Sequence, residues 1–115
     1  MGKTSREKGK RGEREVVKAL RIAGFDCRRG WQSRQGTDEA DVEGTPYWIE
    51  VKRHRKVNIR SAYNQGSEDT DGRPVVVIWR DDFGEWMVSL SLEDWARMAF
   101  KLHNEGKGAA TGRTR

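Results

Sequence analysis

The chain has 115 residues, 36% of them charged, and a net charge of +5 with a pI near 9.7. This length predicts one domain with a modest core, and the basic balance favours a polyanionic partner such as nucleic acid over the simpler explanation of solubility. An internal disulfide is excluded because Cys27 is the only cysteine, and no apolar run approaches the ~20 residues that cross a bilayer. We therefore expect no membrane partner and a cytoplasmic protein; the short size and basic ends would fit a phage-encoded enzyme acting in its host cell.

The first third of the chain predicts a basic arm, a helix and a strand. Residues 1–8 are expected to form a flexible basic arm, with Ser5 as a helix N-cap. Glu13 and the apolar residues that follow it recur at helical spacing, and Gly24 is a plausible end of this helix. Residues 25–29 favour a short strand, before a polar loop over residues 30–37.

The middle of the chain predicts a hairpin and a crossover helix. Strands over about 39–43 and 47–53 are joined by the turn signal Gly44-Thr45-Pro46, and residues 59–66 favour a short helix. Residues 74–79 form a β-branched run typical of a strand covered on both faces. The helix between them suits a crossover between parallel strands.

The last third predicts a strand over 85–90 and a helix that starts at Ser91, which with Asp94 resembles a capping box. Its apolar face, which includes Trp95, is expected to join Trp79 and Trp86 in the core. We expect a single domain over 1–103, a disordered basic tail over 104–115, and an α/β fold with a small mixed central β-sheet flanked by helices.

The strand over 47–53 contains the alternating run Ile49-Glu50-Val51-Lys52. Side chains alternate between the faces of a strand, so Ile49 and Val51 face a core while Glu50 and Lys52 emerge together on the other face. Taken alone, such a run is as often a solvated face as a site.

Three acids could converge on this strand. A tight hairpin would carry Asp41 back beside Glu50, and Glu13 lies on the core-facing stripe of the first helix. Carboxylates that close repel unless a cation lies between them, which predicts a Mg²⁺ site, with Mn²⁺ able to substitute. Asp41, Glu50 and a backbone carbonyl of Ile49 or Val51 would be ligands, and Glu13 could bind a second ion or a bound water.

The ion would activate a water for phosphodiester hydrolysis, and Lys52 would polarise that water or hold the phosphate. Glu43 shares the face of Asp41, so the two could exchange roles, while Glu39 is a second neighbouring acid. We prefer Asp41 because it lies farther from the turn. A zinc site is not expected because the chain has only two histidines. No glycine-rich nucleotide loop is present, so we expect no nucleotide cofactor.

Basic residues beside Trp31 predict a grip on DNA, because Arg and Lys neutralise phosphates and an aromatic ring can stack on an unpaired base. Trp31 could equally be a core or lid residue, and the N-terminal lysines a solvated tail. The candidates for DNA binding are Lys8, Lys10, Arg11, Arg14, Arg28, Arg29, Trp31, Ser33, Arg34, Arg53, Arg55 and Gln65.

Five sequence elements give the chain a resemblance to a known family over about residues 8–80. They are Lys8-Gly9 with Glu13-Arg14-Glu15, Gly24-Phe25 with Arg28-Arg29, Ser33 with Ala40-Asp41-Val42, Ile49-Glu50-Val51-Lys52, and Arg73-Pro74-Val75-Val76-Val77. The chain resembles the PD-(D/E)xK nucleases, and more narrowly the archaeal-type Holliday junction resolvases and their phage relatives. Ala40 stands where the superfamily name expects proline.

The resemblance implies a restriction-endonuclease-like core and a metal-dependent, structure-selective endonuclease that acts as a homodimer. Its active-site set would fall on Glu13, Asp41, Glu50 and Lys52, and Gln65 would match a glutamine on the following helix. We expect paired cleavage of four-way DNA junctions. An endonuclease on linear duplex or flap DNA and a non-catalytic DNA-binding protein remain the alternatives.

Overall fold

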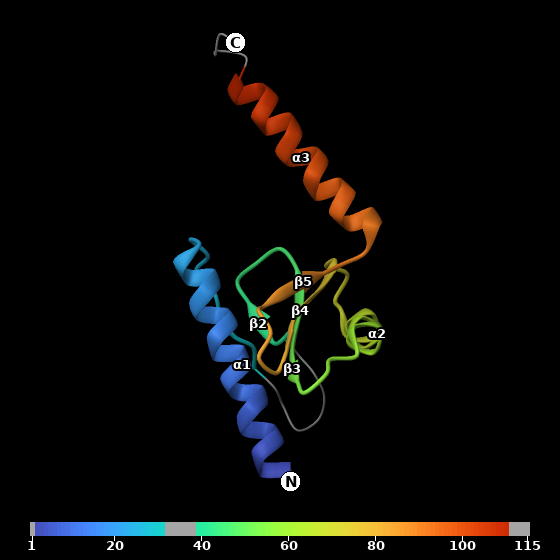
Figure 1. The fold of residues 1–115 in the computed structure, drawn as a ribbon. Coiled ribbons are helices and arrows are strands. Elements are labelled where there is room, and N and C mark those ends of the chain that lie inside the picture. The colour runs from blue at the N-terminus through green and yellow to red at the C-terminus, as the bar shows by residue number, and fades with distance from the viewer. Residues whose placement is uncertain (1, 32–38, 111–115) are drawn as a thin grey trace.

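A computed structural model describes residues 2–31 and 39–110 as a five-stranded mixed sheet with three helices (Figure 1). The strand order is β1-β2-β3-β4-β5; β3 and β4 are parallel, and the other neighbours are antiparallel. This confirms the predicted α/β fold. The elements are α1 (Gly2–Ile22), β1 (Arg28–Arg29), β2 (Val42–Glu43), β3 (Trp48–His54), α2 (Ile59–Asp69), β4 (Val75–Asp81), β5 (Met87–Ser89) and α3 (Leu92–Ala110).

Helices α1 and α2 lie on opposite sides of the sheet (Figure 1). Strand β3 alternates between them, so that Ile49 and Val51 join a core cluster with Val16 and Val17 of α1. Trp48 joins a second cluster on the α2 side. Within β4, residues 75–78 are all buried, as expected of a strand covered on both faces. The parallel pairing of β3 with β4 across α2 confirms the predicted crossover.

Helices α1 and α3 are longer than the sequence pattern predicts. Helix α1 begins at Gly2 rather than at a Ser5 cap, so residues 2–8, predicted as a flexible arm, are helical. Helix α3 continues to Ala110, so residues 104–110 of the predicted disordered tail are helical as well. Lys, Arg, Glu and Ala are good helix formers, and a helix already started extends at little cost. The other tail residues, 111–115, lie outside the described residues.

The apolar face of α3 departs most from expectation. Trp95 is 50% exposed and Leu102 is 63% exposed, so the prediction that this face belongs to the core is wrong for Trp95. Trp79 and Trp86 are partly buried. Figure 1 shows the reason: α3 points away from the sheet instead of lying on it. Within the described residues, no helix combines the length and apolarity needed to cross a membrane.

Two glycines end or turn the chain where it must bend sharply. Gly24, at φ +115°, ends α1: its N–H donates to Arg21 O, and the Phe25 N–H donates to Leu20 O, as in a Schellman motif. This confirms the predicted stop. Gly44, at φ +108°, turns the β2–β3 hairpin, and a Cβ there would lie only 2.4 Å from Asp26 O.

The hairpin should therefore tolerate no side chain at Gly44. Gly72 has nearly the same φ, +110°, but nothing lies within 4 Å of its would-be Cβ, so it is a matched control. We expect Gly72→Ala to lower the free energy of unfolding by about 1–2 kcal/mol through backbone strain alone. Gly44→Ala should lose clearly more, since the contact adds to the strain. Urea unfolding of the two variants checks this, and equal losses would contradict the close packing at Gly44.

Candidate active site

Glu50 is a buried carboxylate in the middle of the sheet. Its residue is 5% exposed, and the indole Nε1–H of Trp48 donates to Glu50 Oε2 at 2.9 Å. Both side chains point to the α2 side of β3, as alternation requires. Gly66 of α2 lets the helix approach this carboxylate, because a Cβ there would lie 3.0 Å from Glu50 Cγ and 2.6 Å from Val75 Cγ1.

Asp41 extends the β2–β3 hairpin with its side chain. The Asp41 N–H donates to Ile49 O at 2.9 Å, in line with the Val42–Ile49 pairing of β2 and β3. Asp41 Oδ2 then accepts the Val51 N–H at 2.8 Å. The carboxylate thus takes the place of a backbone partner and is fixed beside β3. Because N–H and C=O of a strand residue point to the same edge, the Val51 carbonyl also points to the Asp41 side.

Burial disfavours the charged form of both carboxyl groups, and Glu50 adds to this effect on Asp41. Burial, reinforced by Glu50 and Glu13, raises the pKa of Asp41 to about 7, although the Val51 N–H and Lys52 oppose the shift. Burial also raises the pKa of Glu50; Asp69 and Glu13 add to the rise, and Trp48 and Lys52 oppose it. Acids held together at such a cost favour a cation between them.

Glu13 is near enough to act on both pKa values, but it has its own cation. Arg29 of β1 binds Glu13 Oε1 through Nε and Nη2, each at 3.0 Å. Across residues 2–31 and 39–110, no three His, Cys, Asp or Glu side chains converge closely enough to hold a metal ion. The oxygen donors brought together are therefore two carboxylates, Asp41 and Glu50, together with the Val51 carbonyl.

Lys52 follows Glu50 on the same face of β3 and is partly exposed. With His54 at the end of β3 and residues of α2 that include Ser61 and Gln65, it lines a hollow of about 180 Å³. The Gln65 amide donates to Asp69 at 2.9 Å. An ammonium group at the rim, next to two buried acids, is placed to meet an anion that enters from solvent.

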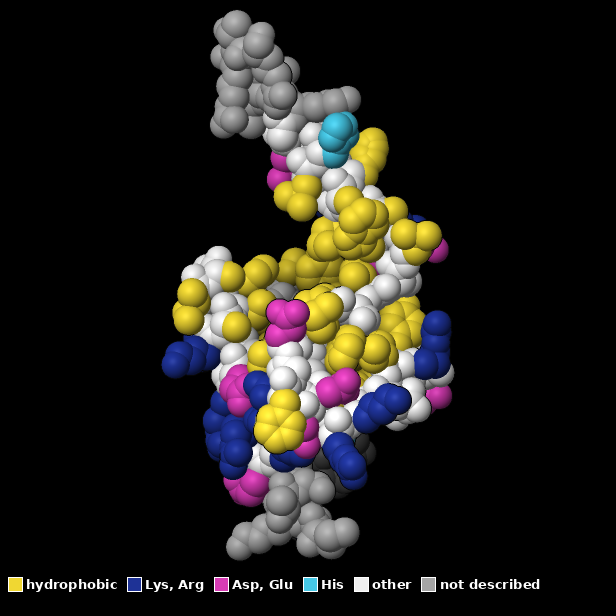
Figure 2. Space-filling view, in the orientation of Figure 1, with side chains coloured by type: hydrophobic (Ala, Val, Ile, Leu, Met, Phe, Trp, Pro, Cys, Tyr) yellow, Lys and Arg dark blue, Asp and Glu magenta, His cyan; other side chains and the backbone are white. Residues whose placement is uncertain are grey.

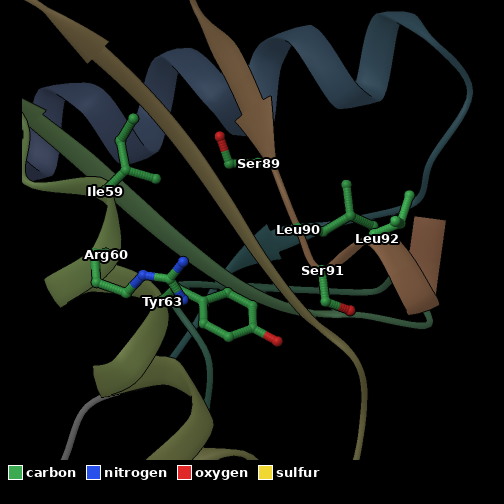
Figure 3. A pocket seen from close by; sticks show the side chains of 7 residues that line it. All are labelled: Ile59, Arg60, Tyr63, Ser89, Leu90, Ser91 and Leu92. Atoms are coloured by element: carbon green, nitrogen blue, oxygen red, sulfur yellow. The ribbon is translucent and has the colours of Figure 1, made fainter.

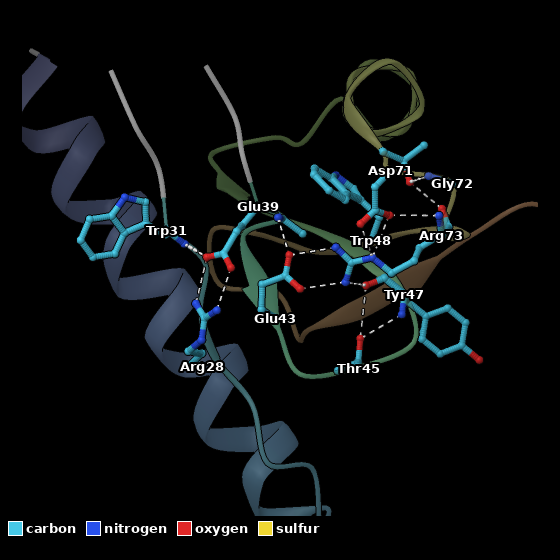
Figure 4. Close-up of polar contacts among 12 residues, drawn as sticks. Arg28, Trp31, Glu39, Glu43, Thr45, Tyr47, Trp48, Asp71, Gly72 and Arg73 are labelled. Carbon is cyan, nitrogen blue, oxygen red and sulfur yellow. Dashed lines mark hydrogen bonds and ion pairs between the residues drawn. The ribbon is translucent and has the colours of Figure 1, made fainter. Parts of the chain in front are cut away.

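Glu43, the alternative to Asp41, is held elsewhere (Figure 4). Arg73 binds both of its oxygens, at 2.8 and 2.9 Å, and the Ala40 N–H donates to Glu43 Oε2. Arg73 also lies over the Trp48 ring, 5.2 Å from its centroid. Glu39 pairs with Arg28 at 2.7 Å. The described structure therefore brings Asp41, and not Glu43, to the Glu50 strand.

Many of the predicted DNA-binding residues are engaged within the protein. Four have acidic partners: Lys8 with Asp82, Arg28 with Glu39, Arg29 with Glu13, and Arg53 with Glu15. Trp31 is 73% exposed, which excludes a core role for it. Four of the predicted residues are basic, exposed and form no ion pair within the described part of the chain, namely Lys10, Arg11, Arg14 and Arg55. Ser33 and Arg34 lie outside the described residues.

A second polar cluster fixes α1 on the sheet. Glu15 accepts from Arg53 at 3.0 Å, from Arg80 at 3.1 Å and from the Trp86 indole at 3.0 Å. Arg53 and Arg80 are register partners on β3 and β4, so one carboxylate joins both strands to the helix that carries Glu13.

Sequence reasoning missed Trp48, Gly66, Arg73 and the Glu15 cluster. Only Trp48 had a local signal, because it stands two residues before Glu50 and must share its face. Comparison of the chain with protein-family models, with curated proteins and with solved structures found no match. The resemblance to junction resolvases therefore stays a prediction.

The raised pKa of Asp41 predicts a pH-dependent stability in metal-free protein. The folded chain keeps the Asp41 proton up to about pH 7, whereas the unfolded chain releases it near 3.8. Folded protein thus binds more protons in between, so the free energy of unfolding should fall as the pH rises from about 4 to 7.

Asp41→Asn should flatten this fall, leaving the part that Glu50 contributes, and should be more stable than the wild type at pH 8. Asp26→Asn, at an exposed acid, is the control and should keep the wild-type slope. Urea unfolding at pH 4.5 and 8 in EDTA measures the difference. An unchanged slope in Asp41→Asn would show that its carboxyl is not buried beside Glu50.

The close approach of α2 predicts a second effect. Gly66→Ala should overpack against Val75 and Glu50 and lower the free energy of unfolding by about 1–3 kcal/mol. Gly9→Ala is a matched helical control, since nothing lies within 4 Å of its would-be Cβ, and it should gain up to about 1 kcal/mol. Thermal or urea unfolding tests both, and a stabilised Gly66→Ala would contradict the contact with Glu50.

Proposed function

We propose that the protein is a metal-dependent endonuclease that cuts branched DNA, most of all four-way junctions, as a homodimer. The observation that carries this proposal is the pair of carboxyl groups formed by buried Glu50 and partly buried Asp41. The pKa values of both are raised, and Lys52 lies on the strand of Glu50. Structural ion pairs lower the pKa of a carboxyl group, as Arg73 does for Glu43. A pair shifted upward is typical of a site built for a cation or for acid–base work.

The donor set fits Mg²⁺. This ion takes oxygen ligands in octahedral geometry, keeps several waters, and is commonly held by only one or two carboxylates. Asp41, Glu50 and the Val51 carbonyl would hold it, and waters would complete the shell. Glu13, held by Arg29, would act through such a water rather than bind directly. Mn²⁺ should substitute because it accepts the same ligands.

A bound Mg²⁺ would supply a Lewis acid for the phosphate and a water of lowered pKa as nucleophile. Lys52 would place its ammonium group against a non-bridging phosphate oxygen, where negative charge grows during the displacement. The Trp48 indole holds Glu50 in one orientation by its hydrogen bond. Val51 does the same for Asp41 through its N–H.

The surface around the site supports a nucleic-acid substrate. In Figure 2, Lys and Arg side chains lie over the half of the molecule that contains α1 and α2, whereas hydrophobic side chains gather toward β5 and α3. The exposed residues Lys10, Arg11, Arg14 and Arg55 are the basic groups most available to phosphates. Exposed Trp31 could stack on a base that is unpaired at a branch point.

The test is cleavage of a labelled four-way junction in Mg²⁺ and in EDTA. Asp41→Asn and Glu50→Gln should each abolish cutting while junction binding is retained, and Lys52→Ala should lower the rate by at least about 10²-fold. Glu43→Gln is the matched control and should still cut, because Arg73 holds Glu43 away from the site. Cutting that survives Asp41→Asn but is lost in Glu43→Gln would mean that Glu43, and not Asp41, is the metal ligand.

Competition of the junction with linear duplex and flap DNA in one reaction decides the substrate. A preference for duplex or flap DNA would be consistent with the proposed metal site but would make that DNA, instead of the junction, the substrate. Binding without metal-dependent cutting of any DNA, supercoiled plasmid included, would leave only a DNA-binding protein.

A further inference from the structure

Helix α3 is an amphipathic helix whose apolar face has no partner among residues 2–31 and 39–110. It has 19 residues and leaves the sheet directly after β5 (Figure 1). Its exposed apolar side chains include Leu92 at 77%, Trp95 at 50% and Leu102 at 63%. Isolated helices of this length are marginal in water, and most helical stability comes from packing such a face.

The helix does not cover its own sheet (Figure 1). Ser91 fixes its first turn, because Ser91 Oγ accepts the Asp94 N–H at 3.0 Å and Ser91 O accepts the Trp95 N–H at 2.9 Å. Only two residues separate this helix from the end of β5. The helix then points outward, so its apolar face lies off the sheet of its own chain (Figure 1).

The sheet carries a matching uncovered surface beside α3. Strand β5 is an edge strand, and its Val88 is 58% exposed. Next to it lies a hollow of about 550 Å³ lined in part by Ile59, Tyr63, Leu90 and Leu92 (Figure 3). Figure 2 shows hydrophobic side chains continuing from this region onto the helix.

We infer that a second copy of this chain covers these surfaces, with the apolar face of each α3 packed on the β5 edge and hollow of the other copy. Both halves of the contact are present on one chain, so a two-fold axis satisfies both at once and closes the assembly. The five exposed apolar side chains of β5 and of this face of α3 would remove roughly 500 Å² per copy, or about 1,000 Å² in all, close to the smallest area of specific interfaces. They are Met87, Val88, Leu92, Trp95 and Leu102.

The polar side of α3 argues against other occupants. Arg97 pairs with Glu93 at 2.6 Å, and its other neighbour Asp94 is acidic as well. This helix therefore has no excess of positive charge to draw nucleic acid or an anionic membrane. The basic groups of the candidate active site lie on other elements, so the interface leaves them free. The link to paired DNA cuts rests on the nuclease proposed above, whereas the interface itself does not.

Light scattering of the full chain after gel filtration, without DNA or metal, tests the interface. The wild type should have twice the 13.2 kDa mass of one chain. Leu102→Glu on α3 and Val88→Glu on β5 should each give the monomer mass. Asn104→Glu, an equal change of charge on the other side of α3, should leave the dimer intact. Circular dichroism verifies that each variant keeps its fold.

A monomeric wild type would overturn the interface, as would a dimer that survives Leu102→Glu or Val88→Glu. If only Leu102→Glu dissociates the dimer, then α3 of one copy pairs with α3 of the other. That result would also refute the packing of α3 on the β5 edge. The nuclease is judged separately. A dimer that never nicks DNA retains the interface and loses the proposed activity, whereas a monomer that nicks DNA retains the metal-dependent activity and loses the interface together with the homodimer.

Discussion

The candidate site depends on two carboxyl groups held beside each other at the middle of a small sheet, Glu50 buried and Asp41 partly buried. Glu50 is covered by α2 because Gly66 carries no side chain, and Asp41 is fixed by the Val51 N–H. Neither contact provides a positive charge, so burial raises both pKa values, and Glu50 adds to the rise at Asp41. By contrast, Glu43, only two positions after Asp41, is paired with Arg73. The contrast favours a site whose acids lower the stability of the fold in order to bind a cation, rather than an accident of packing.

The fold was largely predictable because its signals are local. Alternation in β3, the β-branched run of β4 and the glycine turns fix strand identity, and a helix between two strands implies their parallel pairing. The convergence of Asp41 with Glu50 was predictable for the same reason, since a short hairpin sets its own register. The elements at the ends were not: α1 and α3 extend through Lys- and Gly-rich segments whose composition also suits a flexible chain.

The partners of the site were harder to predict because they come from distant parts of the sequence. Arg73 reaches Glu43 across thirty positions, and Glu15 binds Arg80 across sixty-five. No pattern of periodicity encodes such pairs, which depend on the final packing of α1 and β4. The basic composition also overestimated how many positive side chains are available to DNA. Arg28, Arg29 and Arg53 are all paired with acids, so a count of basic residues is a weak guide to a DNA-binding surface. The exposure of Trp95 follows from the direction of α3, which amphipathic spacing alone does not define.

The hydrogen bond between Trp48 and Glu50 has an optical consequence. An indole that donates to a carboxyl group and lies under the Arg73 guanidinium is sensitive to the charge on both. Any event that changes the charge on Glu50, whether protonation or the arrival of a cation, must alter the electric field along that ring. Replacing the other four tryptophans with phenylalanine would isolate the fluorescence of Trp48. That fluorescence would then report the charge on Glu50 without an added label.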